Sequence, residues 1–239
     1  MMELSYDLHI HSCLSPCGSE DSSPANIAGL ASLLELDVAA LTDHNSCRNC
    51  PAFFKAAREH SFIPIAGMEI NTAEEIHVLC LFPELDAAMD FDGFVYERLL
   101  PIKNDISVYG SQLIMDGTDK VTGEVENCLI NATSIDLYSL SGEVRSRGGI
   151  IIPSHIERAA FSLISTLVFV PDDCGFDCVE IRSKDAVDNL RQAHPYLDRC
   201  KIVHNSDAHV LEDISMPVNK LTAGERSAHG VLAALSGGA

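Results

Sequence analysis

The sequence predicts a single α/β domain built as a closed barrel of parallel strands. Three observations lead to this expectation: runs rich in Val, Ile and Leu recur along the 239 residues, helical patterns separate several of them, and the length suits one domain. With 46% hydrophobic residues, the chain carries enough apolar material for a large core. This composition excludes general disorder.

Seven short runs have the β-branched and apolar composition of buried strands. They are Leu4–His11, Val38–Thr42, Phe62–Ala66, Ile76–Phe82, Ile150–Pro153, Cys178–Ile181 and Lys201–Val203. Strands that alternate with helices pair in parallel, and seven of them in one chain of this length fit an α/β barrel better than two domains.

Helical patterns lie between several of these strands. The first begins at Ser23-Pro24, where Ser is a favoured N-cap and Pro a favoured first helical residue. The others are Pro51–His60, Ser134–Arg147, Asp185–Ala193 and Gly224–Leu235. The stretch Glu84–Asn131 breaks this rhythm, and its Asp116-Gly117 pair predicts a hairpin. We therefore expect residues 1–239 to form one barrel domain, with an insertion at 84–131 that covers one rim.

Charge and cysteine usage restrict the partners and the compartment. The 16 Lys and Arg against 35 Asp and Glu give a net charge of −19, which argues against long nucleic acid, because nonspecific binding to a polyanion needs clustered cations. No uncharged apolar run approaches the ~20 residues of a membrane span, and no signal-peptide pattern opens the chain. Nine irregularly spaced cysteines fit free thiols in a reducing compartment. We expect a cytoplasmic protein with no membrane partner.

The first strand combines three potential metal ligands on one face. Asp7, His9 and His11 alternate with apolar residues, so a strand of period two points all three polar groups the same way. Facing the barrel axis, an unpaired imidazole or carboxylate would cost several kcal/mol unless something satisfies it. A metal ion would satisfy all three, whereas a strand whose polar face meets water is the alternative.

The same residue types recur at the ends of other predicted strands, and the carboxyl ends of barrel strands are where catalysis occurs. They are Thr42-Asp43-His44, Met68-Glu69-Ile70, Ser154-His155 and Ser206-Asp207-Ala208-His209, with His77 near the start of the fourth run. Each motif alone is weak evidence, because a single His at a strand end is more often a hydrogen-bonded core residue. Together they predict a metal centre on one rim.

Five motifs, in this order, resemble those of the PHP family, the polymerase and histidinol phosphatase domain. They are Asp7-Leu-His9-Ile-His11, Thr42-Asp43-His44-Asn45, Gly67-Met-Glu69-Ile, Pro153-Ser-His155 and Ser206-Asp207-Ala-His209. The resemblance runs from Asp7 to His209. It implies a distorted (β/α)7 barrel, up to three divalent ions and hydrolysis of phosphoesters.

Carried over residue by residue, the resemblance also implies a ligand set. The first ion would be held by His9, His11, Glu69 and Asp207; the second by Glu69, His77 and His155; the third by His44 and His209. Family members often add a His or Asp to the third ion shortly after the first motif. Here that neighbourhood reads Ser15-Pro16-Cys17-Gly18, so Cys17 is the candidate, and the sequence departs from the family pattern.

The residue types suit this chemistry. Imidazole and carboxylate together favour Zn²⁺, Mn²⁺ or Fe²⁺, and two ions ~3.5–4 Å apart could hold a hydroxide and direct it at phosphorus. We expect Asp7 to accept a ring N–H from a ligating histidine, and Asp43 to do the same or to relay a proton. Arg158, three residues after His155, could bind a phosphate with its bidentate fork, and Arg182 is a further candidate.

The main hypothesis is a metal-dependent phosphoesterase for a small phosphorylated substrate: a phosphomonoester, a nucleoside bisphosphate or a short 5′-phosphorylated oligonucleotide. An amidohydrolase, also a metal barrel that opens with His-x-His, is one alternative, although it needs neither Asp43-His44 nor Asp207-x-His209. A noncatalytic metal-stabilised module is the other. The sequence identifies neither the substrate, nor the metal, nor the oligomeric state.

Overall fold

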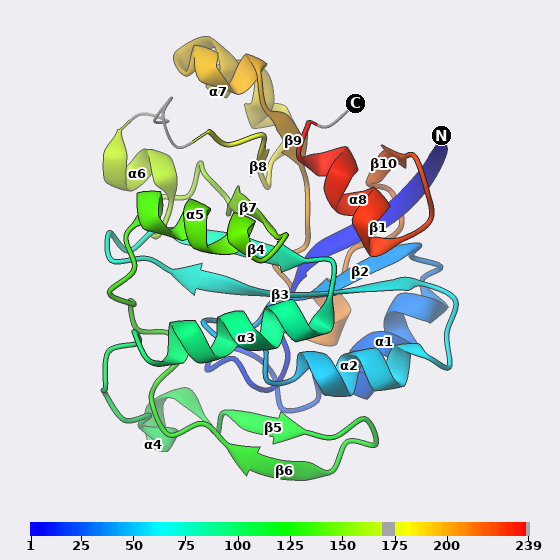
Figure 1. Cartoon of the computed structure of the whole chain (residues 1–239), viewed down its shortest axis with the longest axis vertical. Helices are drawn as coiled ribbons and strands as arrows, with labels where there is room; N and C mark the ends of the chain where they lie inside the picture. The colour runs from blue at the N-terminus through cyan, green and yellow to red at the C-terminus, as the bar shows by residue number, and fades with distance from the viewer. Residues whose placement is uncertain (169–174, 238–239) are drawn as a thin grey trace.

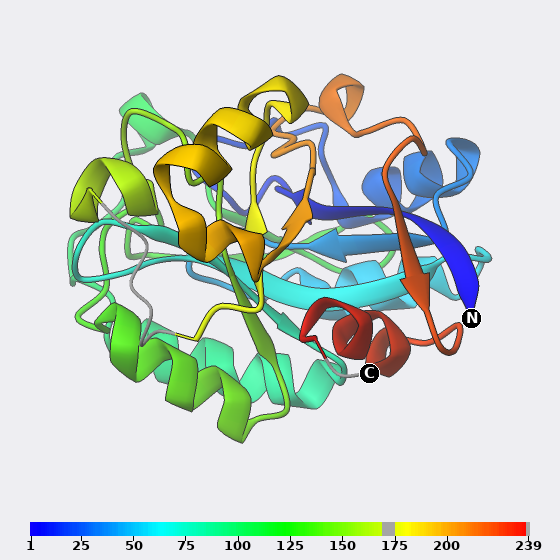
Figure 2. The same cartoon turned by 90° about the horizontal axis from the view of Figure 1, so that it is seen from above.

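The computed structural model describes residues 1–168 and 175–237. Its centre is a curled six-stranded sheet (Figures 1 and 2). In spatial order its strands are β10 (Lys220–Ala223), β1 (Met2–Ile10), β2 (Val38–Leu41), β3 (Ile63–Asn71), β4 (His77–Phe82) and β7 (Ile150–Pro153). A separate parallel pair consists of β8 (Cys178–Glu180) and β9 (Lys201–Val203). The expected α/β class is confirmed, and all seven predicted runs contain strands.

Backbone hydrogen bonds link the β8–β9 pair to both sides of the main sheet. The Ile156 N–H, just after β7, donates to Glu180 O over 3.0 Å. On the other side the His11 N–H, just after β1, donates to Ala208 O over 2.9 Å. The carboxyl ends of β7, β8, β9 and β1 are therefore neighbours at one rim.

Parallel pairing throughout the sheet was the wrong expectation for β4. This strand pairs antiparallel with both β3 and β7, because only residues 72–76 separate β3 from β4, whereas a parallel crossover needs a dozen or more residues. The first residue of β4, His77, consequently lies at the same rim as the carboxyl ends of β1 to β3. Strand β3 is also longer than predicted, and Glu69 lies inside it, paired with Leu79.

Five of the helices correspond to predicted helical patterns, with shifted ends. They are α1 (Pro24–Leu33), α2 (Cys50–Ala57), α5 (Leu137–Ser146), α7 (Val187–Ala193) and α8 (Ala228–Leu235). Helix α1 begins as expected, because the Ser23 hydroxyl accepts a hydrogen bond from the Asn26 N–H. Short helical segments complete the chain: α4 (Ile106–Tyr109), α6 (Leu163–Leu167), η2 (Lys184–Ala186), η3 (Pro195–Asp198) and η4 (Leu211–Asp213).

The stretch 84–131 contains a helix that the sequence analysis did not anticipate. Helix α3 (Leu85–Tyr96) buries Phe91 and Val95 in the main core and lies along the sheet in Figure 1. The expected hairpin across Asp116-Gly117 is present, because β5 (Leu113–Met115) pairs antiparallel with β6 (Val121–Glu124).

Two apolar clusters cover the two faces of the sheet. The larger joins one face to α1, α2, α3 and α5, and the smaller joins the other face to α8. The smaller cluster contains Tyr6, Leu8, Ile65 and Leu79 from the strands of the main sheet. Among the helices in residues 1–168 and 175–237, none has the length and apolar character that crossing a bilayer requires.

Candidate metal centre

Four buried side chains converge at the rim where β1, β3 and the loop after β9 meet. Their potential ligand atoms lie within 4.8 Å of one another, and the residues are His9, His11, Glu69 and Asp207. The His9 Nε2 atom lies 3.0 Å from His11 Nε2 and 3.3 Å from Glu69 Oε1. The Asp207 Oδ1 atom is 3.4 Å from His9 Nε2 and 3.5 Å from His11 Nε2. These are the four residues that the family resemblance assigned to the first ion.

Strict alternation along β1 does not extend to its end. Tyr6 and Leu8 pack in the α8 cluster, whereas Ile10 packs in the cluster on the opposite face. The pairing register of β1 against β2 shifts between Asp7 and Ile10. This irregularity re-aims the strand where it delivers its two histidines, a common role for a bulge beside a functional site.

Glu69 is the hub of the cluster, because its two carboxylate oxygens contact different histidines. Its Oε1 atom is 3.2 Å from His155 Nε2 and 3.3 Å from His77 Nδ1, in addition to its contact with His9. Its Oε2 atom is 3.1 Å from His44 Nδ1 and 3.5 Å from His11 Nε2. A carboxylate placed in this way can serve two cations, one at each oxygen.

A further group surrounds the mouth of the cluster. Its potential ligand atoms again lie within 4.8 Å of one another and belong to His11, Cys17, His44 and His209. Cys17 is exposed at the residue level, although desolvation and the charges of Glu69 and Asp43 raise the pKa of its thiol above the usual range. A nearby cation would reverse that shift, because it favours the thiolate.

Several buried polar atoms of the cluster have no hydrogen-bond partner in the described part of the chain. They are both ring nitrogens of His77, the Nδ1 atoms of His44 and His155, and the Oδ1 atom of Asp207. His77 Nδ1, His44 Nδ1 and Asp207 Oδ1 have ion-pair contacts only, whereas His77 Nε2 and His155 Nδ1 have neither a hydrogen bond nor an ion pair within the described residues. A buried polar atom left without a partner costs about 1–3 kcal/mol. Their concentration around one carboxylate hub shows that the residues present fit a group of divalent cations.

The pKa shifts of Glu69 and His44 favour the forms that bind metal, whereas the shift of His9 favours the protonated ring. Burial lowers the pKa of His9, but Glu180, Glu69 and Asp207 raise it more, so that it lies well above its usual value. Burial raises the pKa of Glu69. The neighbouring His77 and His9 rings lower it by more than burial raises it, so the pKa lies well below its usual value. Burial and the adjacent His11 hold the pKa of His44 well below its usual value. An ionised carboxylate and a neutral imidazole are the forms that bind metal.

Sequence reasoning missed Glu180, which supports the cluster from β8. Its fully buried Oε2 atom lies 2.9 Å from His9 Nδ1 and accepts a hydrogen bond from Asn205 Nδ2 over 2.7 Å. Its Oε1 atom accepts from the His155 N–H over 2.9 Å. Burial raises the pKa of Glu180, but the His9 ring lowers it more, so this carboxyl is ionised. An acid between Val179 and Ile181 in an apolar strand was the available signal.

Asp7 does not have the contact that the sequence analysis expected. Its carboxylate accepts backbone N–H groups, from His9 over 3.3 Å, Ser206 over 3.2 Å and Ser215 over 2.9 Å. The Nδ1 atom of His9 contacts Glu180 instead. Asp7 thus ties β1 to the loop after β9, and burial raises the pKa of its carboxyl.

Asp43 acts on the cluster through a hydroxyl. Its Oδ1 atom accepts from Ser15 Oγ over 2.7 Å, and the same Ser15 hydroxyl lies 3.0 Å from His11 Nδ1. The Ser12 N–H and hydroxyl also donate to Asp43. The chain His11–Ser15–Asp43 can orient the imidazole, but Asp43 does not touch the ring directly.

The cluster opens into a pocket of about 440 Å³. It is lined by Cys17, His44, Glu69, His77, Ile130, Arg158, Phe161, Arg182, Asp207, His209 and Asp213. Arg158 is 44% exposed in its side chain, and its Nη1 atom lies 3.2 Å from Asp207 Oδ2. Arg182 is 50% exposed, and its Nη1 atom lies 3.9 Å from the same oxygen. Two arginines therefore border the opening above the candidate ligands.

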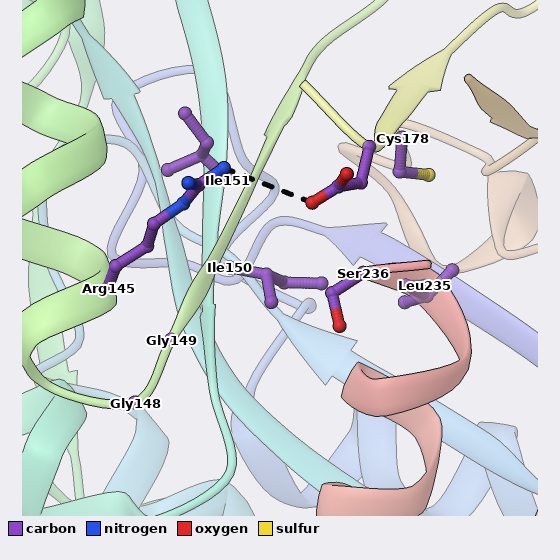
Figure 3. A pocket seen from close by; sticks show the side chains of 9 residues that line it. Arg145, Gly148, Gly149, Ile150, Ile151, Cys178, Leu235 and Ser236 are labelled. Carbon is purple, nitrogen blue, oxygen red and sulfur yellow. Dashed lines mark ion pairs between the residues drawn. The ribbon is translucent and has the colours of Figure 1, made fainter. Parts of the chain in front are cut away.

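A different pocket, shown in Figure 3, lies at the amino ends of β7 and β8, away from this rim. Its charged residues, Arg145 and Asp177, form an ion pair with 3.9 Å between Nη2 and Oδ2. The remaining lining residues are mostly Gly, Ile and Leu. It offers no cluster of ligands comparable with that around Glu69.

Comparisons with known proteins match almost the whole chain. The family model of the PHP domain matches residues 7–225. Among solved structures, the lesion-specific endonuclease PfuEndoQ from Pyrococcus furiosus aligns with a TM-score of 0.68 and 18% identity over 99% of this chain. An endonuclease Q complex with a 27-mer duplex carrying an abasic lesion aligns with 0.65 and 18% identity, also over 99%.

The chain spans only 56% and 57% of those two proteins. A protein from Bifidobacterium adolescentis, assigned as a metal-dependent phosphoesterase, aligns with a TM-score of 0.61 and 15% identity. That alignment covers 90% of this chain and 91% of the other. No curated protein sequence matches the chain. At these identities the solved structures establish the fold alone.

Proposed function

Because the chain belongs to the PHP domain family, we propose that it hydrolyses phosphoester bonds with the help of two or three divalent ions. The observation that carries the proposal is the convergence of five histidines on the two oxygens of Glu69, beside a pocket bordered by two arginines. Such a site combines ligands for cations with positive charge for an anionic substrate.

We assign ligands to the three ions as the family resemblance implied. His9, His11, Glu69 and Asp207 would hold the first; Glu69, His77 and His155 would hold the second; His44, His209 and Cys17 would hold the third. The mixed imidazole and carboxylate set suits Zn²⁺, Mn²⁺ or Fe²⁺. When bound, the ions polarise the phosphoryl group and lower the pKa of water.

The residues around the ions position them and the substrate. Glu180 and the Ser15–Asp43 pair each contact the Nδ1 atom of a ligating histidine, which orients the Nε2 atoms of His9 and His11 toward Glu69. Arg158 and Arg182 bind phosphate oxygens, since a guanidinium forms paired hydrogen bonds with them. Both guanidinium groups also lie within ion-pair distance of Asp207 Oδ2, at 3.2 Å and 3.9 Å.

The proposal includes the way in which the strands close around this rim. We infer a distorted (β/α)7 barrel in which the β8–β9 pair completes the wall between β7 and β1. The hydrogen bonds of Ile156 with Glu180 and of His11 with Ala208 support this closure. It would explain why ligands from β1, β3, β4 and the four loops that follow β1, β2, β7 and β9 reach a single cluster.

The proposed substrate is a small phosphomonoester, a nucleoside bisphosphate or a short 5′-phosphorylated oligonucleotide. One structural neighbour binds a DNA duplex with an abasic lesion, but it is nearly twice as long as this chain. The net charge of −19 disfavours a long polyanion here. Two arginines at the pocket provide positive charge for one or two phosphates rather than for an extended backbone.

The test is a panel assay on protein reconstituted with Zn²⁺, Mn²⁺ or Fe²⁺. Phosphomonoesters, phosphodiesters, short oligonucleotides and N-acyl amides are compared, with released phosphate and released amine as readouts. We expect phosphate release that a chelator abolishes and added metal restores. Phosphate release that survives complete metal removal would contradict the mechanism. Amine release would favour an amidohydrolase, and no turnover with fully loaded protein would indicate a noncatalytic metal-binding module.

A further inference from the structure

We propose that the site selects phosphate esters whose alcohol part carries a planar ring, such as a nucleobase, and that Phe161 stacks on this ring. The proposal rests on the function proposed above and narrows its substrate class. Phe161 lines the same pocket as Arg158, Arg182 and the metal ligands, yet this hydrophobic side chain is 41% exposed. An exposed aromatic face within an anion-binding pocket suits a ligand that is both charged and planar.

One face of the Phe161 ring packs against another side chain. It stacks on His77 with ring centroids 5.0 Å apart and an interplanar angle of 25°. Within residues 1–168 and 175–237, no other aromatic ring packs against Phe161. Ile130 adds an apolar side chain to the lining of the same pocket. A planar group entering the pocket can therefore extend the His77–Phe161 stack.

The backbone holds Phe161 in place at an energetic cost. Its φ angle is +55°, in the left-handed region that a bulky aromatic residue rarely adopts. Its carbonyl accepts a hydrogen bond from the His77 N–H over 3.1 Å, which ties the loop to the first residue of β4. Backbone strain of this kind persists only where surrounding contacts enforce it, and it concentrates at functional sites.

The same loop carries the phosphate ligand Arg158. The Ser162 hydroxyl donates to Arg158 O over 2.6 Å, and it also accepts from the Ser165 N–H at the start of α6. The loop from His155 to Ser162 thus presents a cation and an aromatic face three residues apart, from a fixed backbone. A preorganised pair of this kind loses little entropy when a nucleotide binds.

The decisive comparison uses two substrates that differ only in the base: adenosine 5′-monophosphate and ribose 5-phosphate. Both present the same primary phosphate ester, so the ratio of their kcat/KM values isolates the contribution of the ring. We expect the parent to prefer the nucleotide by about 5- to 100-fold, the range that one stacked base contributes. Phe161→Leu keeps an apolar side chain against His77 but removes the aromatic face, so the ratio should fall toward one.

Tyr109→Leu is the matched control, because Tyr109 is also 41% exposed but lies in α4 and is not among the pocket residues. It should preserve the ratio. Phe161→Trp provides an independent binding signal, since the chain contains no tryptophan. Its fluorescence should be quenched by adenosine 5′-monophosphate and unaffected by ribose 5-phosphate.

The outcomes distinguish a failure of the ring selectivity from a failure of the phosphoesterase function on which it rests. Hydrolysis of neither ester, nor of any other in the panel, would overturn the phosphoesterase function itself. Equal kcat/KM values for the two esters in the parent would overturn the ring selectivity alone. A preference for the nucleotide that Phe161→Leu leaves intact would overturn the role of Phe161, as would a tryptophan signal that responds equally to both compounds.

Discussion

The Oε2 atom of Glu180 lies 2.9 Å from the Nδ1 atom of His9, and both side chains are completely buried. An ionised carboxylate at this distance favours a proton on Nδ1 and turns Nε2 toward Glu69 and Asp207, where it would bind a cation in its unprotonated form. The contact also spans the chain, from β8 back to β1. The orientation of His9, the first ligand that we propose, therefore depends on a residue 171 positions away in sequence.

Glu180→Gln should weaken metal binding while leaving the ligand count unchanged. The amide matches the carboxylate in shape but loses its charge, and loss of such a supporting contact typically costs 10–100-fold in metal affinity. Titration with Co²⁺, followed by its visible absorption, measures this directly. Glu143→Gln, on α5, is the control because Glu143 pairs with the partly exposed Arg147 and contacts none of the clustered histidines. Unchanged Co²⁺ affinity in Glu180→Gln would show that His9 needs no such partner.

Glu69→Gln should lose more metal and more activity than any single His→Ala change at the second or third ion. Glu69 is the one ligand that we assign to two ions, and its oxygens contact five histidines. The matched comparison is His155→Ala, which removes a ligand from one ion only. Elemental analysis and phosphate release are measured on the same preparations. A Glu69→Gln variant that retains two ions and most of its turnover would refute the bridging role.

The convergence of these polar residues on one rim could be predicted from the sequence because each motif adjoins an apolar run. His9, His11, Glu69 and Asp207 form the compact group that the family resemblance implied, and their binding of metal stays a prediction. Three features were harder to find. The antiparallel β4 depended on the short connection after Asn71, the contact of Glu180 depended on which strand neighbours β1, and the contacts of Asp7 depended on the loop after β9.

These missed features share a physical reason. The local pattern of apolar and polar residues indicates which face of a strand is apolar. It does not indicate which backbone group or side chain, distant in sequence, will contact a given polar group. Asp7 lies on a strand rich in metal ligands, yet its partners are the N–H groups of Ser206 and Ser215, about 200 residues away. Phe161 likewise looks like an ordinary loop residue until its strained backbone and its stacking on His77 are seen.

Arg158→Ala should mainly raise the KM for phosphate esters and leave metal content unchanged, because a phosphate ligand at the pocket edge contributes binding rather than the chemical step. Arg158→Lys should recover only part of the loss, since an ammonium cannot form the paired contact. Steady-state kinetics with elemental analysis tests both. Arg145→Ala, in the pocket of Figure 3, removes a guanidinium remote from the cluster and should match the parent. Parental kinetics in Arg158→Ala would identify Arg158 as a surface residue.

Asp37→Asn should destabilise the fold near neutral pH and have less effect in acid. Burial raises the pKa of Asp37, but the Ser5 N–H at 2.9 Å and Arg226 at 2.6 Å lower it more, so it lies below its usual value. The unfolded state therefore binds more protons near the unperturbed pKa of about 3.9. The stabilisation is present above that pH and is lost as pH falls through the folded pKa.

We expect Asp37→Asn to lower the free energy of unfolding by about 1 kcal/mol at pH 7, a value discounted because Arg226 is partly exposed. Urea unfolding of parent and variant at pH 7 and in acid measures the difference. Glu3→Gln breaks an exposed ion pair with Lys220 and serves as the control. A difference between parent and Asp37→Asn that stays constant down to pH 2 would rule out the carboxylate as its origin.

Cys17→Ala should remove about one ion per chain and leave the ions around Glu69 in place, because its sulfur lies within 4.8 Å of potential ligand atoms of His11, His44 and His209. Burial of the sulfur and the surrounding carboxylates disfavour a free thiolate, so the ligand form depends on a cation. Thiolate suits Zn²⁺ or Fe²⁺ better than Mn²⁺, and Cys17→His should therefore restore binding while reducing the preference for zinc.

The control for this prediction is Cys13→Ala. Cys13 is only four residues away, but it is buried and its Sγ atom contacts the Leu113 carbonyl rather than the histidines. Elemental analysis of parent, Cys13→Ala and Cys17→Ala, purified identically, distinguishes a lost ligand from a general effect of removing a thiol. If Cys17→Ala holds as much metal as the parent, water or another side chain completes the third site, and the departure from the family pattern at Cys17 has no consequence for metal binding.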